Sequence, residues 1–176
     1  GDAVTKTDNK PHDPSDPNSP ADDRWAFTTA TTALNYGSAA ALAAASRALR
    51  GYRDELADEC LATAKRAWEF ESKRKPNLYK FGNTTGGHPK DEELDAAVEL
   101  LITTGEAQYA KRVASLWPTI NERFIWNAVP AARALPHMDK AFAAKLKKRA
   151  AKQLEDSKKN LAENPFGVPI TRGGWA

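Results

Sequence analysis

The sequence has one cysteine, Cys60, among 176 residues. One thiol cannot form a disulfide within the chain or build a zinc site that needs several cysteines. Cys60 lies in a helical pattern, where a lone cysteine is most often a small buried apolar residue. No cluster of Asp, Glu and His suggests a metal site either. We therefore expect neither a metal nor a cofactor.

The sequence also lacks long apolar runs. No stretch approaches the ~20 residues of a membrane span, and no charged-then-apolar leader opens the chain. The net charge of +3 and the pI near 9.0 come from Lys and Arg with acids interleaved among them, which is a weak argument for nucleic acid. We expect neither a membrane nor a nucleic acid as partner.

Strand-type alternation is absent, and helical periodicity takes its place. With 41% hydrophobic and 28% charged residues, the composition is that of a globular domain. Apolar residues recur at steps of three and four, which predicts helices. The expected helices are 32–50, 53–72, 89–104, 106–116, a short one around 126–135, and a long one capped by Asp139. The fold class is all-α, built from antiparallel helix hairpins.

The pattern also predicts which residues face the core. For the first helix these are Leu34, Gly37, Ala41, Ala44, Ala45 and Leu49; for the second, Leu56, Cys60, Leu61, Ala64, Ala67 and Trp68. For the third they are Leu94, Ala97, Val98 and Leu101; for the long helix, Phe142, Leu146, Ala150 and Leu154. The Lys-rich remainder of the long helix is expected to be a solvated face.

The connections alternate between short and long. Gly51 and Gly105 mark short links that make hairpins, whereas the long links 1–30, 73–90, 117–128 and 162–176 all fall at the other ends of the helices. Loops on a rigid scaffold carry function, so the long loops at one rim are expected to form a binding face. Residues 1–27 form an extended Pro/Asp-rich loop, and 28–176 form the helical domain.

Four stretches resemble glycoside hydrolase family 9, the cellulases and related β-glucanases with an (α/α)6 barrel. They are TTATTALNYGSAAALAAASRALRGY (28–52), LADECLATAKRAWEFE (56–71), DEELDAAVELLITTGEAQYAKRV (91–113) and NPFGVPITRGGWA (164–176). The resemblance covers most of 28–176 and is nearest to variants with an Ig-like domain ahead of the barrel. It implies an enzyme that hydrolyses β-glucosidic bonds of glucans with inversion, and a secreted or periplasmic location.

The family's catalytic motifs are missing from this sequence. Inversion needs two carboxyl groups that flank the scissile bond with room for a water. The DAGD-type base motif does not occur, and neither does the HHR signature nor an acid-donor segment after it. We therefore expect the middle of a barrel, about six helices, with no catalytic residue. Its partners would be a glucan or oligosaccharide and the rest of its own catalytic domain, and the shaped loop 164–176 would lead into a further helix.

Aromatic residues in the long loops are the candidate sugar contacts, because flat rings pack against the C–H face of a pyranose. Trp25, with Asp23 and Arg24, resembles a family loop with an acid and an aromatic at the sugar subsites; alternatively, Trp25 packs this loop onto the first helix. Trp175 follows two glycines that permit close backbone approach, and it lies where the family places a subsite Trp.

Four other residues are candidates, and three of them, Trp126, His88 and Arg172, have a second interpretation. Trp126 lies where the family has a stacking Trp, but its neighbours Phe124 and Ile125 favour a place in the core. Tyr79 and His88 lie where the family has sugar contacts, although His88 is also a good helix-start residue. Arg172 would donate two hydrogen bonds to sugar hydroxyls or cover the surface.

Other polar and aromatic residues are expected to be structural. Trp68 has core spacing, and Asp91, Glu92 and Glu93 are helix-start charges. Two further functions stay open on the sequence: a non-catalytic helical carbohydrate-binding or scaffold module, and a structural repeat protein without a sugar role.

Overall fold

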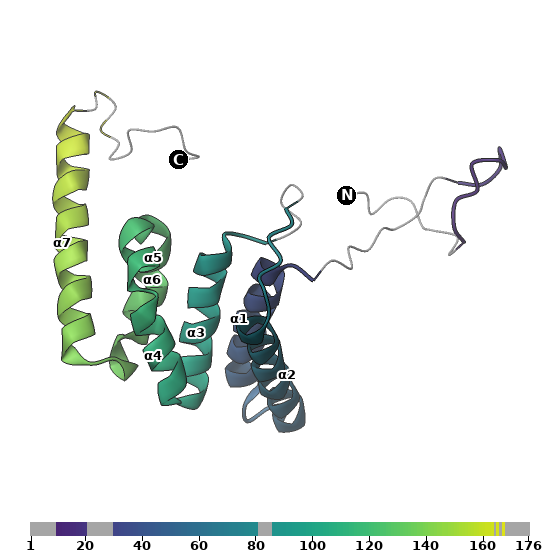
Figure 1. Cartoon of the computed structure of the whole chain (residues 1–176), viewed down its shortest axis with the longest axis horizontal. Helices are drawn as coiled ribbons and strands as arrows, with labels where there is room; N and C mark the ends of the chain where they lie inside the picture. The colour runs from purple at the N-terminus through teal and green to yellow at the C-terminus, as the bar shows by residue number, and fades with distance from the viewer. Residues whose placement is uncertain (1–9, 21–29, 81–85, 164, 166, 168–176) are drawn as a thin grey trace.

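Seven α-helices and one short 3-10 helix make up the described part of the chain in a computed structural model (Figure 1). The structure describes residues 10–20, 30–80, 86–163, 165 and 167. The helices are α1 (Thr32–Leu49), α2 (Asp54–Lys73), α3 (Pro89–Thr104), α4 (Ala107–Ser115), α5 (Trp117–Glu122), α6 (Phe124–Ala134), η1 (Leu135–His137) and α7 (Lys140–Glu163). Within these ranges there is no strand, and no helix has the length and apolar character needed to span a bilayer.

The ends of the helices follow from local sequence. The hydroxyl of Thr31 accepts the backbone N–H of Leu34 at 3.3 Å and caps the start of α1. Asp139 accepts the N–H of Phe142 at 2.7 Å at the start of α7, as the sequence predicts. α3 ends at Gly105, whose φ of +69° is left-handed and favours glycine.

The helices form an inner and an outer row. α1, α3 and α6 make the inner row with α3 in the middle, while α2 packs on α1, α4 on α3 and α7 on α6. The three inner helices begin at the same end of the molecule, the upper end in Figure 1, where the connection between α2 and α3 also lies. The expected hairpins at Gly51 and Gly105 are both present.

The core is centred on α3 and on three aromatic rings that contact one another in a row, those of Tyr36, Trp68 and Tyr109. Leu94 and Val98 of α3 are completely buried, in agreement with the predicted face. Trp68 lies with its ring centroid 5.4 Å from that of Tyr36 and 5.5 Å from that of Tyr109, so its assignment to the core is confirmed. Cys60 is buried, also as expected.

The face predicted for the first helix is wrong. Leu34 and Ala41 are exposed, whereas Tyr36, Ala39 and Ala43 are buried. Because alanine occurs on all sides of α1, its sequence contains little information about which side is apolar. The packing of α2 and α3 decides the buried face instead.

The loop expected at 117–128 is also wrong, because this segment is helical. α5 covers 117–122 and α6 starts at Phe124, with the break at Arg123. Pro118 lies in the first turn of α5, where the missing N–H of proline has no helical partner to lose. The proline therefore marks the start of a helix and not a loop.

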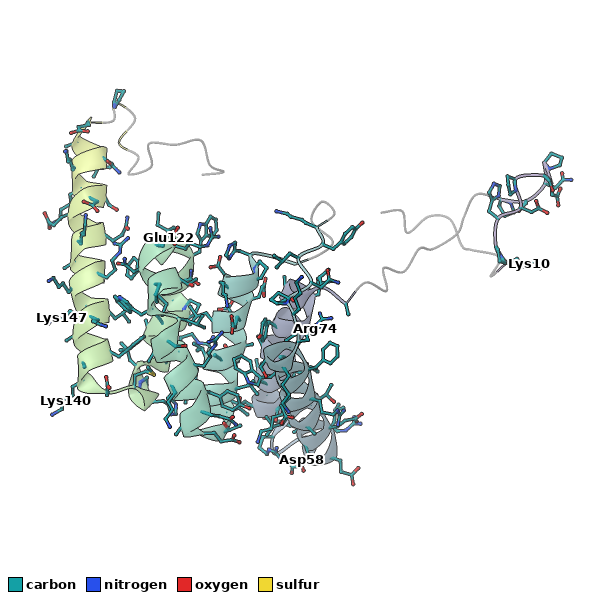
Figure 2. All side chains as sticks on the ribbon, viewed as in Figure 1. Lys10, Asp58, Arg74, Glu122, Lys140 and Lys147 are labelled. Atoms are coloured by element: carbon teal, nitrogen blue, oxygen red, sulfur yellow. The ribbon has the colours of Figure 1, made fainter. Side chains whose placement is uncertain are left out.

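The long helix is buried only in its first turns. Phe142 and Leu146 are buried as predicted, but Ala150 is exposed and Leu154 is 55% exposed. At 1.5 Å per residue, α7 is about 36 Å long and α6 about 16 Å, so α7 extends beyond its partner. The Lys-rich outer surface of α7 is exposed to solvent, as Figure 2 shows around Lys147.

Candidate functional site

The candidate site is the rim, defined here as the described parts of the α2–α3 connection (74–80 and 86–88), the first turn of α3 and the α5–α6 corner at Arg123. The backbone of Asn77 fixes the connection against α1 through two bonds with Thr32: the Thr32 N–H donates to the Asn77 carbonyl at 3.0 Å, and the Asn77 N–H donates to the Thr32 hydroxyl at 2.9 Å. Closer to α3, Glu92 accepts the Gly87 N–H at 3.1 Å. The described parts of this loop are thereby attached to α1 and α3.

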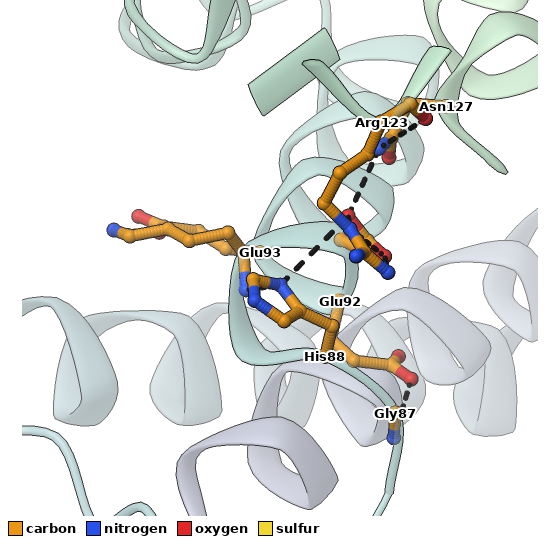
Figure 3. A network of polar contacts seen from close by, with 8 residues as sticks. Gly87, His88, Glu92, Glu93, Arg123 and Asn127 are labelled. Atoms are coloured by element: carbon orange, nitrogen blue, oxygen red, sulfur yellow. Dashed lines mark hydrogen bonds and ion pairs between the residues drawn. The ribbon is translucent and has the colours of Figure 1, made fainter. Parts of the chain in front are cut away.

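An ion pair joins the beginnings of α3 and α6 (Figure 3). The Nε of Arg123 lies 3.0 Å from both carboxylate oxygens of Asp91, and a second guanidinium nitrogen lies 2.7 Å from Oδ2. The amide of Asn127 donates to Asp91 Oδ1 at 2.9 Å and to the Arg123 carbonyl at 3.1 Å. This geometry is a two-pronged Arg–carboxylate contact, which fixes orientation as well as distance.

The charge of Asp91 is stabilised in this network. Burial alone would raise the pKa of Asp91, but the hydrogen bonds from Arg123 and Asn127 outweigh it and hold that pKa below its ordinary value. Asp91 is therefore ionised at neutral pH and holds α6 at a fixed position beside α3. Its role is to position the rim.

His88 lies beside this network, and its two ring nitrogens have different roles. Its Nδ1 accepts the backbone N–H of Lys90 at 3.3 Å and lies 3.9 Å from Asp91. Because Nδ1 acts as an acceptor, the neutral ring carries its proton on Nε2. His88 thus serves both as the cap of α3 and as a hydrogen-bond donor at the rim.

The structure places the described aromatic candidates on the surface. The side chain of Tyr79 is 52% exposed and that of Trp126 is 72% exposed. The core placement that Phe124 and Ile125 favoured for Trp126 is wrong, because Ile125 is itself 71% exposed and only Phe124 packs inward. Trp126 lies in the first turn of α6, next to the Arg123 corner. The candidates Asp23, Arg24, Trp25, Arg172 and Trp175 lie outside the described residues.

The acids at the start of α3 do more than the sequence predicts. Asp91 and Glu92 lie in the first turn as expected. Glu93, however, is only 4% exposed and binds Lys90 at 2.6 Å and Arg112 of α4. Its assignment as a simple helix-start charge is wrong, because it lies on the side of α3 that α4 covers.

Asp95, one turn further along α3, escapes sequence analysis altogether. Burial, followed by the charges of Glu92, Glu99 and Asp91, raises the pKa of Asp95 to about 6. No hydrogen bond or ion pair reaches its carboxylate from any described residue. An inverting pair needs a second free carboxyl across a bond, and these three neighbours are already bound, so we assign Asp95 no catalytic role.

Sequence analysis also missed Arg123 and Asn127. Arg123 stands at a break between helical patterns, and Asn127 lies inside a helix at a buried position. A buried amide inside a helix is a signal for a polar network, but it does not identify the partner. Across the described residues, no group of three or more His, Cys, Asp or Glu could hold a metal ion.

Comparison with known proteins places these observations in a family. The family model described as glycosyl hydrolase family 9 matches residues 1–175. No curated protein matches the chain.

Solved structures agree in architecture. A metagenome-derived glycoside hydrolase family 9 endoglucanase is 26% identical, with a TM-score of 0.60 over 80% of this chain and 28% of its own. A thermostable endoglucanase from Alicyclobacillus acidocaldarius is 18% identical, with a TM-score of 0.61 over 80% of this chain and 29% of its own. AaCel9A in complex with cellobiose-like isofagomine is 20% identical, with a TM-score of 0.61 and the same coverage of each chain.

These likenesses confirm the expected fold class. The helices of the chain form part of an (α/α)6 barrel, with α1, α3 and α6 in the inner row. The chain spans less than a third of the length of these solved structures.

Proposed function

This chain belongs to glycosyl hydrolase family 9, and on that basis we propose that the complete protein hydrolyses β-glucosidic bonds of glucans, as a cellulase does, with inversion at the anomeric carbon. The 28–176 segment contributes scaffold helices and part of the sugar-binding rim. Both catalytic carboxyl groups belong to other parts of the catalytic domain, because the motifs that carry them do not occur in this sequence.

The observation that carries this proposal is the rim itself. The inner helices begin at one end, and the Asp91–Arg123 pair fixes two of these beginnings side by side. Exposed Tyr79 and Trp126 and the Nε2 of His88 belong to the same end. Flat rings together with firmly held polar groups are what a sugar chain requires of a binding surface.

Among the five candidates outside the described residues, Trp25 and Trp175 are proposed as further stacking rings. Asp23, Arg24 and Arg172 are proposed as hydrogen-bonding partners of sugar hydroxyls. The substrate is the glucan chain, and the remaining helices of the barrel are the protein partner.

The test uses the complete protein and a soluble cellulose derivative. We expect release of reducing ends, and we expect NMR to show that the first-formed sugar has the inverted anomeric configuration. Trp126→Ala should raise KM for long cello-oligosaccharides several-fold, since loss of one stacking ring costs about 1 kcal/mol. Tyr52→Phe is the matched control, because Tyr52 is 86% exposed at the opposite end of α1.

Two results would contradict the proposal. A complete protein that binds cello-oligosaccharides without cleaving them would be a carbohydrate-binding module. A protein that neither binds nor cleaves them, with unchanged behaviour in the Trp126→Ala variant, would be a helical scaffold.

A further inference from the structure

A hollow lies at the outer side of the rim and shares part of the rim connection with it, namely Arg74, Pro76, Leu78 and His88. It is a cleft of about 680 Å³ between α2 and α4, and its floor includes Tyr36 of α1 and Glu93 of α3. Trp68 and Glu71 line it from α2, Gln108 from α4 and His88 from the start of α3. Its volume is in the range of small-molecule sites. Since the chain itself supplies all these walls, the cleft does not depend on further helices of the barrel.

The shape of the cleft is fixed at both ends. At the end away from the rim, Lys65 of α2 binds Glu106 at the start of α4 at 2.5 Å, and Trp68 contacts the edge of Tyr109. At the rim end, Pro76 and Leu78 border the cleft, and the Asn77–Thr32 bonds hold this segment in place. Arg74 lies at the same end of α2 (Figure 2). A binding site that is already formed loses little free energy in ordering its own groups.

The charged groups of the cleft are already engaged with one another. Glu71 binds Arg74 and the Asn35 amide, each at 2.5 Å, while Glu93 binds Lys90 and Arg112. An added ion would find no unpaired opposite charge and would lose its hydration. The cleft therefore suits a neutral ligand.

Neutral hydrogen-bonding groups remain available at its surface. No hydrogen bond of the Tyr36 hydroxyl is found among the described residues, and burial with the nearby Glu93 charge raises the pKa of Tyr36 to about 12, so it stays a donor. The His88 Nε2 provides a further group, and the exposed Gln108 amide, which donates one N–H to Glu106 at 2.6 Å, keeps its second N–H for a ligand.

We propose that this cleft is an accessory carbohydrate site that binds a neutral pyranose unit, with Tyr36, His88 and Gln108 donating to its hydroxyls. Leu78, Pro76 and the edge of Trp68 contact the apolar C–H face of the sugar. The choice of glucose-based sugars rests on the proposed function. The site lies outside the inner row of helices, so it would hold a glucan without cleaving it.

The experiment is an isothermal titration of the 176-residue chain with cellobiose and cellotetraose. Tyr36→Phe removes one hydroxyl and keeps the packing, and we expect it to weaken sugar binding about fivefold, which corresponds to one lost hydrogen bond. Gln108→Ala changes an exposed residue and removes its amide from the cleft, and we expect it to weaken binding about threefold. Tyr52→Phe, the matched tyrosine control, should leave binding unchanged.

Two outcomes would overturn the inference. If Trp126→Ala or Tyr79→Phe abolishes binding while Tyr36→Phe and Gln108→Ala have no effect, the sugar binds at the rim, and the proposed function stands without the accessory site. If the chain binds neither sugar while the complete protein cleaves cellulose, the accessory site alone is excluded. Glucan cleavage by the complete protein is measured separately and tests the proposed function by itself.

Discussion

Helices α3 and α7 differ sharply in how much of each is buried. In α3, eight of 16 residues are buried, among them the charged Glu93 and Glu99. In α7, only Phe142 and Leu146 of 24 residues are buried. Both helices are rich in charge, so their charge content alone does not explain the difference.

The difference follows from the number of neighbours. α3 packs against α1, α4 and α6. Its acids form ion pairs with arginines of these three helices and of the residue before α6. The pairs are Asp91 with Arg123, Glu93 with Arg112, and Glu99 with Arg47 and Arg133. α7 packs mainly on α6 and reaches α5 through the edge contact of Phe142 with Trp117. Most of its side-chain ion pairs are with its own residues.

The largest expected effect is a cavity in α3. Leu94→Ala removes a completely buried side chain that three helices enclose. We expect it to lower the free energy of unfolding by about 3 kcal/mol, the sum of lost apolar burial and an unfilled cavity. Urea denaturation followed by circular dichroism measures this. A cost below about 1 kcal/mol would mean that α3 is not the centre of the core.

The next effect concerns the buried charge of α3. Glu99→Gln removes the negative charge that pairs with Arg47 and Arg133, and we expect a loss of about 2 kcal/mol at pH 7. Burial opposes ionisation, but the bonds from the two arginines hold the pKa of Glu99 below its ordinary 4.5. The contribution is therefore present above pH 4.5 and is lost as the pH falls through the lowered pKa. The difference in the free energy of unfolding between wild type and Glu99→Gln should therefore be larger at pH 7 than at pH 3.

The charge of Asp95 is expected to change the free energy of unfolding in the opposite direction to that of Glu99. Because its pKa is raised to about 6 in the folded protein, the ionised carboxylate destabilises the fold at neutral pH. Asp95→Asn should stabilise the chain by about 1–2 kcal/mol at pH 7. The gain should decrease from pH 6 downward and vanish below pH 3.8, where both states are protonated. A gain that is equal at pH 7 and pH 3.5 would show that charge is not its cause.

The smallest effect is expected in α7. Leu154→Ala changes a side chain that is 55% exposed, and we expect it to alter the free energy of unfolding by less than about 0.5 kcal/mol. The same urea series measures it, with Leu94→Ala as the reference. A cost above about 1 kcal/mol in the isolated chain would show that the far half of α7 is covered in solution.

Part of the candidate site could be predicted from the sequence. The long connection between α2 and α3, His88 at the start of a helix, and Tyr79 in the loop all lie where the pattern places them. The surface position of Trp126 could not be predicted, because its neighbours Phe124 and Ile125 look equally apolar and only one of them faces the core. That choice depends on where α3 and α7 lie.

The contacts between elements were not accessible to sequence analysis either. Asp91 and Arg123 are 32 positions apart, and nothing in either neighbourhood identifies the other as its partner. The same holds for Tyr36 and Gln108, which share the cleft through the packing of two hairpins.

The sequence by itself determined the all-α class, the hairpins at Gly51 and Gly105, the end of a helix at Gly105 and the cap at Asp139. These features depend on hydrogen bonds and backbone conformations within a few residues, so local chemistry is sufficient to specify them. Only the tertiary structure decided the buried face of α1, the raised pKa of Asp95 and the pairing of the α3 acids. Each of these depends on burial against distant segments, and burial is a property of the packed molecule.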